Sequence, residues 1–191
     1  MLPAFRRVSF TPRRRCSAAD HVLCGRNGLS KIKLACIGDA MPAVVLDTCV
    51  IVDMFMHSRP RHAKAVRLKE TITASNITVL IPAFAIFEIS HAVRQEKQLN
   101  GGQVVQGVAW EGVSNGLNVD PVPIDESFVH RYLDVSLPEM RAGDLVFAAL
   151  AKGEGLPLIT EDKRFLTAAE TAGIKAFSID AYLNHVLGSA G

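Results

Sequence analysis

AVVLDTCVIVD, at residues 43–53, puts two acids into a mostly apolar run. Residues 44–46 are apolar at consecutive positions, which is typical of a short strand buried on both faces of a parallel sheet. Asp47 follows this strand directly. An acid there either caps the next helix or binds a ligand, because a buried carboxylate without a partner costs free energy. The second acid, Asp53, is expected to be exposed.

Apolar runs alternate with amphipathic segments along the chain from Met41 onward. Strands are predicted at residues 44–46, 77–81, 119–124, 156–160 and 175–179. Helices are predicted at residues 49–55, 62–74, 82–97 with Pro82 in the first turn, 103–116, 125–133, 143–152 and 163–172, and from residue 180. This alternation favours right-handed βαβ crossovers, and therefore an α/β fold with one parallel sheet between layers of helices. Two prolines in the strand at 119–124 favour the edge of the sheet for it.

The composition favours one domain and disfavours several classes of protein. The chain has 191 residues, 49% of them hydrophobic, which is enough for one core. Its longest apolar stretch, residues 77–87, is shorter than the roughly 20 residues of a membrane helix, so a soluble protein is expected. The four cysteines form no CxxC pair, which favours a reducing compartment and hence the cytoplasm. Walker-type and GxSxG signatures, which mark P-loop nucleotide hydrolases and serine hydrolases, are absent.

The first 40 residues differ in charge from the rest of the chain. They hold eight Lys or Arg and two acids, a net charge of +6, whereas residues 41–191 hold 13 against 17, a net charge of −4. Because residues 1–40 lack apolar periodicity, they are expected to be disordered, and the domain is expected to span residues 41–191. Three interpretations of this leader stay open: an arm that binds nucleic acid, a targeting peptide, or an upstream extension that the cell does not make. The last is favoured, with translation starting at Met41, because a strand begins directly after it.

Four acids fall at the ends of predicted strands or near the starts of the helices that follow: Asp47, Glu88, Asp144 and Asp162. Each alone is explained as a helix cap, worth about 1 kcal/mol, or as a solvated residue. In a parallel sheet, however, all four converge beyond the carboxyl ends of the strands, where ligands bind. Converging carboxylates repel one another unless a cation lies between them. Oxygen ligands select Mg²⁺ or Mn²⁺, which leave positions for phosphate oxygens, so phosphodiester hydrolysis is expected.

Four stretches of the chain, taken together and in this order, resemble the PIN-domain nucleases. They are VVLDTCVIVD at 44–53, PAFAIFEISHAV at 82–93, RAGDLVFAALAK at 141–152 and LITEDKRF at 158–165. The resemblance covers residues 41 to about 180. It implies a PIN-like three-layer α/β/α sandwich around a central parallel sheet of about five strands.

The same resemblance assigns roles to the four acids. Asp47 and Asp144 are expected to be the main carboxylate ligands of Mg²⁺ or Mn²⁺, and Glu88 and Asp162 to complete an acidic quartet. Glu161 adjoins Asp162, which leaves open which of the two faces the metal. Asp162 is favoured because it matches the T-x-D pattern of the family.

Thr48 and Thr160 stand where the family has hydroxyl side chains that orient the acids. Cys49 lies beside Thr48, and a small buried side chain is expected there rather than a nucleophile, because the sequence locates no partner histidine. One rival function is a phosphatase that forms an aspartyl-phosphate on Asp47, although such enzymes use a second acid at the position of Cys49. Another rival is a non-catalytic interaction module with a PIN-like fold.

In size and layout, the chain from Met41 resembles the VapC-type toxins of type II toxin-antitoxin pairs. This resemblance implies an endoribonuclease that depends on Mg²⁺ or Mn²⁺, leaves 5′-phosphate and 3′-hydroxyl ends, forms a homodimer and is blocked by a small antitoxin protein. RNA must approach an acidic site, so basic residues are expected beside it. The candidates for phosphate contacts are Arg59, Arg61, Lys64 and Arg67, and a solvated helix face is the alternative for each.

Overall fold

The apolar run that precedes Asp47 forms β1 (Ala43–Leu46), the strand in the middle of the sheet. The structure is a computed structural model that describes residues 42–99, 110–132 and 136–188, all within one unit, Asp39–Gly191. Val44, Val45 and Leu46 are each at most 1% exposed, so the prediction of a strand buried on both faces is confirmed. The expected leader, residues 1–40, lies outside the described residues.

Five parallel strands form the sheet of the described residues, in the order β3-β2-β1-β4-β5. The other four strands are β2 (Thr78–Pro82), β3 (Val119–Val122), β4 (Leu158–Ile159) and β5 (Ala176–Phe177). Val45 is in register with Leu80 of β2 on one side and with Leu158 of β4 on the other. The predictions of a parallel sheet and of β3 at its edge are therefore confirmed.

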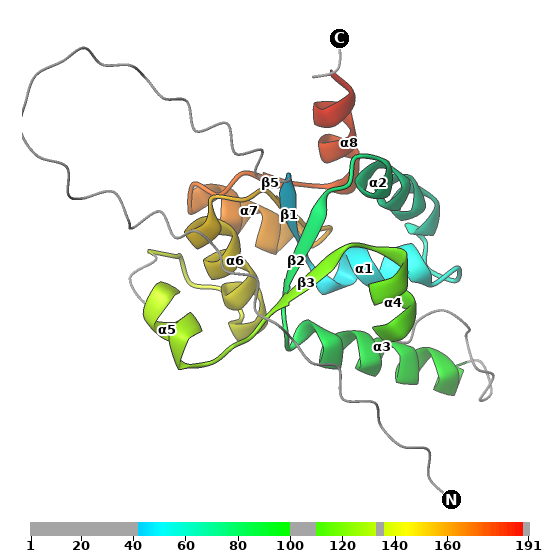
Figure 1. The fold of residues 1–191 in the computed structure, drawn as a ribbon, viewed down its shortest axis with the longest axis horizontal. Helices are drawn as coiled ribbons and strands as arrows, with labels where there is room; N and C mark the ends of the chain where they lie inside the picture. The colour runs from blue at the N-terminus through cyan, green and yellow to red at the C-terminus, as the bar shows by residue number, and fades with distance from the viewer. Residues whose placement is uncertain (1–41, 100–109, 133–135, 189–191) are drawn as a thin grey trace, which may run out of the picture. The chain divides into compact units, whose positions relative to one another are not determined.

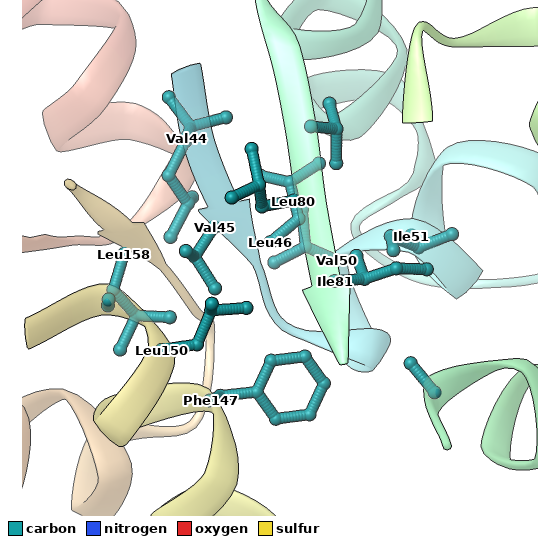
Figure 2. Packing of buried hydrophobic residues seen from close by; sticks show 14 of the residues in the cluster. Val44, Val45, Leu46, Val50, Ile51, Leu80, Ile81, Phe147, Leu150 and Leu158 are labelled. Carbon is teal, nitrogen blue, oxygen red and sulfur yellow. The ribbon is translucent and has the colours of Figure 1, made fainter. Parts of the chain in front are cut away.

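Helices cover both faces of this sheet, as a three-layer α/β/α fold requires. The helices are α1 (Thr48–Phe55), α2 (His62–Ala74), α3 (Ala85–Leu99), α4 (Trp110–Gly116), α5 (Glu126–Tyr132), α6 (Ala142–Glu154), α7 (Lys163–Thr171) and α8 (Ile179–Gly188). Figure 1 shows α6 and α7 on one side of the strands and α1 and α2 on the other. Figure 2 shows Phe147 and Leu150 of α6 on one side of β1, and Ile51 of α1 on the other. None of the helices in the described ranges is both long enough and apolar enough to cross a membrane.

Several predicted boundaries differ from those of the structure. Pro82 ends β2, in register with Val122, and α3 begins only at Ala85, so the prediction that Pro82 lies in a helix is wrong. The pairing with β3 at this point does not need the N–H that proline lacks, because the next residue, Ala83, donates its N–H to the Val122 carbonyl. Strands β4 and β5 have two residues each and are shorter than predicted. Part of the predicted helix at 103–116 lies outside the described residues, and α4 is the part that is described.

Candidate functional site

The strand order reverses at β1, in the middle of the sheet. The chain builds β2 and β3 on one side of β1, and then returns to build β4 and β5 on the other side. In open parallel sheets, ligands bind at such a reversal, beyond the carboxyl ends of the strands. Asp47 follows β1, and Thr160 and Asp162 follow β4, so three predicted site residues lie at this reversal.

All four predicted acids line one pocket of about 300 Å³. Asp47 comes from the N-terminus of α1, Glu88 from the first turn of α3, Asp144 from the first turn of α6, and Asp162 from the N-terminus of α7. The fold thus brings together side chains that are far apart in the sequence. We call this cavity the acidic pocket; the role of its acids as metal ligands stays a prediction.

Asp47 is both a helix cap and a pocket residue. Its Oδ1 accepts a hydrogen bond from the Cys49 backbone N–H at 3.4 Å, which makes it the N-cap of α1. Its Oδ2 accepts hydrogen bonds from the Thr160 hydroxyl at 2.6 Å and from the Cys49 thiol at 3.0 Å. Thr160 is fully buried, so its hydroxyl holds the Asp47 carboxylate at the exit of β1. These donors are all neutral, so none of them sets a positive charge against the carboxylate of Asp47.

Glu88 is connected to Asp47 through Thr48. The Thr48 hydroxyl donates to Glu88 Oε2 at 2.5 Å and so links the start of α1 to α3. Burial raises the pKa of the Glu88 carboxyl; the hydrogen bond from Thr48 lowers it, and the charge of Asp47 raises it further. Thr48 and Thr160 therefore each donate a hydrogen bond to one acid of the pocket, and the orienting role expected of them stays a prediction.

The pKa of the Asp144 carboxyl is also raised. Burial is the largest cause, followed by the negative charges of Asp47 and Asp162, while the positive charge of Arg141 lowers the pKa. Glu88 adds a smaller increase. Repulsion of this kind is expected where carboxylates converge without a cation between them.

Asp162, rather than its neighbour Glu161, lines the acidic pocket. Asp162 caps α7, where its Oδ1 accepts hydrogen bonds from the backbone N–H groups of Arg164 at 2.8 Å and Phe165 at 3.2 Å. Glu161 accepts instead from the Ile179 backbone N–H at 2.9 Å, at the start of α8. Asp162 and not Glu161 is therefore at the acidic pocket, while the expectation that Asp162 faces a metal stays a prediction.

Cys49 is half-buried and serves as a hydrogen-bond donor to Asp47. Burial raises the pKa of its thiol far above the usual value, and the adjacent charge of Asp47 raises it further. A thiol that stays protonated is a poor nucleophile. The geometry therefore gives no support to a nucleophilic Cys49, but the side chain is only half-buried and lines the acidic pocket, so the expectation of a small buried side chain is met only in part.

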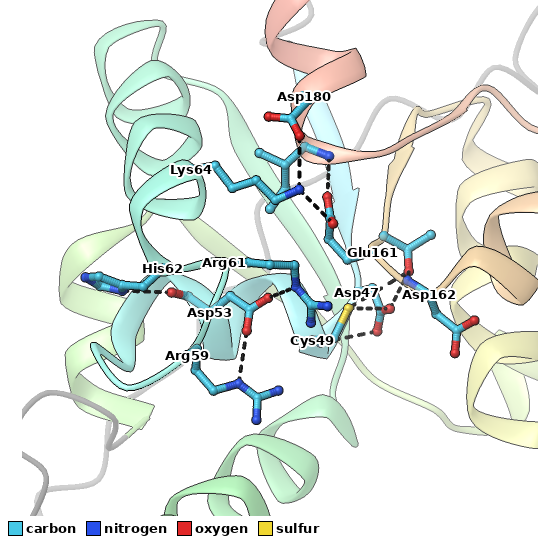
Figure 3. Close-up of polar contacts among 12 residues, drawn as sticks. Asp47, Cys49, Asp53, Arg59, Arg61, His62, Lys64, Glu161, Asp162 and Asp180 are labelled. Atoms are coloured by element: carbon cyan, nitrogen blue, oxygen red, sulfur yellow. Dashed lines mark hydrogen bonds and ion pairs between the residues drawn. The ribbon is translucent and has the colours of Figure 1, made fainter.

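Asp53 is fully buried, so the prediction that it is exposed is wrong. Its Oδ1 accepts from Arg59 Nε at 3.0 Å and its Oδ2 accepts from Arg61 Nε at 2.5 Å, as Figure 3 shows. The His62 ring Nδ1 lies 2.9 Å from the Asp53 carbonyl oxygen. The loop after α1 folds back over Asp53 and supplies two cations, which is how proteins make a buried carboxylate tolerable.

The four residues predicted to contact RNA lie in different environments. Arg59 lines the acidic pocket, and Arg61 shares its buried partner Asp53. Lys64 is paired with Glu161 at 2.9 Å and with Asp180 at 3.0 Å, so it connects α2 to α8 (Figure 3). Arg67 is exposed on α2 and is not among the residues that line the pocket.

Val52, Ala92 and Gln95 also line the acidic pocket, although none of them is predicted from the sequence. Ala92 and Gln95 follow Glu88 by four and seven positions along α3, so helical spacing is a signal that places them on the same face.

Arg141 lies three positions before Asp144, and its guanidinium Nη1 is 3.8 Å from Asp162 Oδ2.

The donors in the acidic pocket fit a divalent cation. Among the described residues, no three His, Cys, Asp or Glu side chains are arranged to hold one metal ion together. Magnesium, however, takes only one or two protein carboxylates directly, and oxygen donors suit Mg²⁺ and Mn²⁺. Burial is the largest cause of the raised pKa values of Glu88 and Asp144, and the negative charges of neighbouring acids add to it, so a cation between these acids would offset part of the cost.

Comparison with known proteins supports this description. The family model of the PIN domain matches residues 44–171. Among solved structures, VapBC2 from Rickettsia felis bound to a DNA fragment from their promoter has a TM-score of 0.50 at 16% identity, covering 71% of this chain and 98% of that chain. FitAcB from Neisseria gonorrhoeae has a TM-score of 0.48 at 20% identity, covering 71% and 97%. PAE2754 from Pyrobaculum aerophilum has a TM-score of 0.48 at 18% identity, covering 76% and 98%. No match was found among curated proteins.

Proposed function

Because this chain belongs to the PIN domain family, we propose that it is an endoribonuclease that depends on Mg²⁺ or Mn²⁺ and acts in the cytoplasm as the toxin of a type II toxin-antitoxin pair. One observation carries the proposal: four carboxylates from four helices line a single pocket at the point where the strand order reverses. Such a pocket suits the hydrolysis of a phosphodiester, whose negative charge must be offset before water can attack.

Asp47 and Asp144 are the residues that would hold the ion, with Glu88 and Asp162 beside them. A divalent ion in this position supplies Lewis-acid polarisation of the phosphate and of an attacking water. Thr160 keeps the Asp47 carboxylate in place through its 2.6 Å hydrogen bond. Removal of either hydroxyl partner, Thr48 or Thr160, would let an acid move away from its position.

Arg59 is the best candidate for a contact with RNA phosphate. It lines the acidic pocket, and its Nε atom is used by Asp53, which leaves the two terminal nitrogens of the guanidinium to donate elsewhere. Arg61 is held by the same carboxylate. Lys64 and Arg67 are weaker candidates, because Lys64 is paired with two acids and Arg67 is not among the residues that line the pocket.

The family resemblance also underlies the proposed partners, a second copy of the chain and a small antitoxin protein. A short reading frame next to this gene that encodes a DNA-binding protein would support the toxin role. Co-expression of that protein should relieve growth inhibition caused by this chain. If expression of the chain alone does not slow growth, the toxin role fails, whereas the nuclease proposal is tested separately.

The nuclease proposal is tested with the purified full chain and single-stranded RNA. We expect cleavage with Mg²⁺ or Mn²⁺, no cleavage with a chelator, and products that carry 5′-phosphate and 3′-hydroxyl ends by mass spectrometry. Cleavage that persists in the chelator would contradict the metal dependence. Absence of cleavage by several preparations with either ion would favour a non-catalytic module instead.

A further inference from the structure

A second cavity adjoins the acidic pocket and is not used by the proposed function. It has a volume of about 210 Å³ and shares Asp144 and Asp162 with the acidic pocket. The acidic pocket extends from these two acids toward α1 and α3, whereas the second cavity extends toward Met140, Arg141, Arg164 and Ala168. Anything bound in the second cavity therefore lies directly next to the acids.

Two exposed arginines stand at the wall of the second cavity. Arg141 is the N-cap residue of α6, and Arg164 is the second residue of α7. A cation at a helix N-terminus opposes the helix dipole and is mildly destabilising. Helix stability therefore does not explain why each of these helices has an arginine near its N-terminus at this cavity. Arg141 is 72% exposed and its nearest approach to Asp162 is 3.8 Å, so its guanidinium is available to another anion.

The rest of the second cavity combines one exposed acid, Glu139, with apolar side chains. Met140 and Ala168 are partly exposed in it, and Phe165, which is buried, forms part of its lining. A methionine side chain adapts to flat ligands of different outline. The volume of the cavity is below the roughly 300–1,000 Å³ of pockets that enclose a whole drug-sized molecule, so it suits one small group.

We propose that the second cavity is a subsite for the nucleotide next to the scissile phosphate of the RNA. Arg141 and Arg164 bind the phosphate of that nucleotide, and Met140 and Ala168 contact its base. The proposal rests on the proposed RNA cleavage, because it assigns part of the same substrate to a place beside the acids. It follows that the cavity contributes to the choice of the base at the position next to the cut.

The test uses the full chain with Arg141→Gln, Arg164→Gln and the cavity-filling Ala168→Leu, which changes no charge. Arg131→Gln is the matched control, because Arg131 is an exposed arginine on α5 that lines neither cavity. Each of the three cavity variants should raise KM for a short single-stranded RNA by about fivefold, more than it lowers kcat. Ala168→Leu should also change the preferred base next to the cut, which a loss of charge alone would not do.

Binding is measured separately from cleavage, by fluorescence anisotropy of labelled RNA on the Asp47→Asn background. Weaker binding by the three cavity variants than by Arg131→Gln supports the subsite even if the wild-type chain cleaves nothing, in which case only the nuclease proposal fails. If the wild-type chain cleaves RNA while the three variants match Arg131→Gln in KM, binding and base preference, the subsite is wrong and the nuclease proposal stands.

Discussion

Two acidic regions lie at helix α1, and they differ in whether cations are paired with their carboxylates. Asp53, inside α1, is fully buried and is paired with both Arg59 and Arg61. Asp47, six positions earlier, lies in a pocket with three other carboxylates and accepts its hydrogen bonds from neutral groups of Thr160 and Cys49. Figure 3 shows Asp53 and Asp47 in one view, with Arg59 and Arg61 turned to Asp53.

The difference teaches which acids mark a functional site. Where an acid is buried for structural reasons, the chain provides cations from a loop only six to eight residues away. In the acidic pocket, burial and mutual repulsion raise the pKa of Glu88 and Asp144 instead. Such an arrangement costs stability, and this cost is typical of sites that bind a cation or a reacting group. Poor compensation, rather than burial, is therefore the useful signal.

Asp47→Asn is expected to have the largest effect, and the effect should fall on activity. Asn is as good an N-cap as Asp, so α1 should keep its start, while the proposed metal site loses a charge. Cleavage of RNA, measured as kcat/KM with Mg²⁺ or Mn²⁺, should fall about a thousandfold, which equals about 4 kcal/mol of activation free energy. The control is Glu126→Gln, at an acid that is 90% exposed on α5, and it should keep full activity. Full cleavage by Asp47→Asn would show that the acidic pocket, like Asp53, is not needed for activity.

Asp53→Asn should produce the opposite result, a loss of stability. Breaking a buried ion pair leaves charge without a partner, and we expect the free energy of unfolding to fall by about 3 kcal/mol. This is the lower end of the usual range, because Arg59 and Arg61 are partly exposed. Urea unfolding measures the change. Asp180→Asn is the control, since Asp180 pairs with Lys64 at the surface and should lose less than about 1 kcal/mol. Equal losses in the two variants would show that the buried ion pairs of Asp53 stabilise the fold no more than the surface pair of Asp180.

The parallel sheet and the positions of the four acids could be predicted because both depend on local sequence. Each acid lies next to an apolar run, and a parallel sheet gathers the ends of such runs at one edge. The burial of Asp53 could not be predicted in the same way. It depends on a loop that folds back over α1, and the arginines of that loop look like surface residues in the sequence.

At two other places the sequence alone did not decide the structure, and in each the deciding contact comes from a neighbouring element. Pro82 is compatible with either the end of a strand or the start of a helix, and the neighbouring strand β3 decides between them by pairing with it. Glu161 and Asp162 are adjacent acids of the same chemistry. Glu161 is held by the first backbone N–H of α8 and by Lys64 of α2, and Asp162 lines the acidic pocket.

Addition of the metal should change the free energy of unfolding differently in variants of the two regions, by a smaller amount than the substitutions above. If the acidic pocket binds Mg²⁺ or Mn²⁺, an ion concentration of about ten times its Kd raises the free energy of unfolding by about 1.4 kcal/mol. Asp53→Asn should show the same increment on its lower baseline, whereas Asp47→Asn should show little. Urea unfolding with and without the ion measures this. An increment that survives in Asp47→Asn would place the ion somewhere other than the acidic pocket.

Asp144→Asn should have the smallest effect, and its sign depends on pH. The raised pKa of Asp144 means that the folded protein disfavours the charged carboxylate. Well below the ordinary pKa the group is protonated in both states and the substitution changes little. The cost to the folded state begins as the pH rises above the ordinary pKa and is complete above the raised pKa, so Asn should stabilise the metal-free protein by less than about 1 kcal/mol near neutral pH. Urea unfolding in a chelator, near pH 3 and near pH 7, measures the difference.

A purely structural role for Asp144 predicts the opposite sign. An acid in the first turn of a helix is favourable to the helix dipole, so its removal from α6 would then destabilise the protein at neutral pH, with or without metal. If Asp144 belongs to a cation site, Asn stabilises the metal-free protein, and the order reverses when the ion is added because only the wild-type pocket gains the full increment. The reversal itself is thus the decisive result, and a loss of stability in both conditions would assign Asp144 to the helix alone.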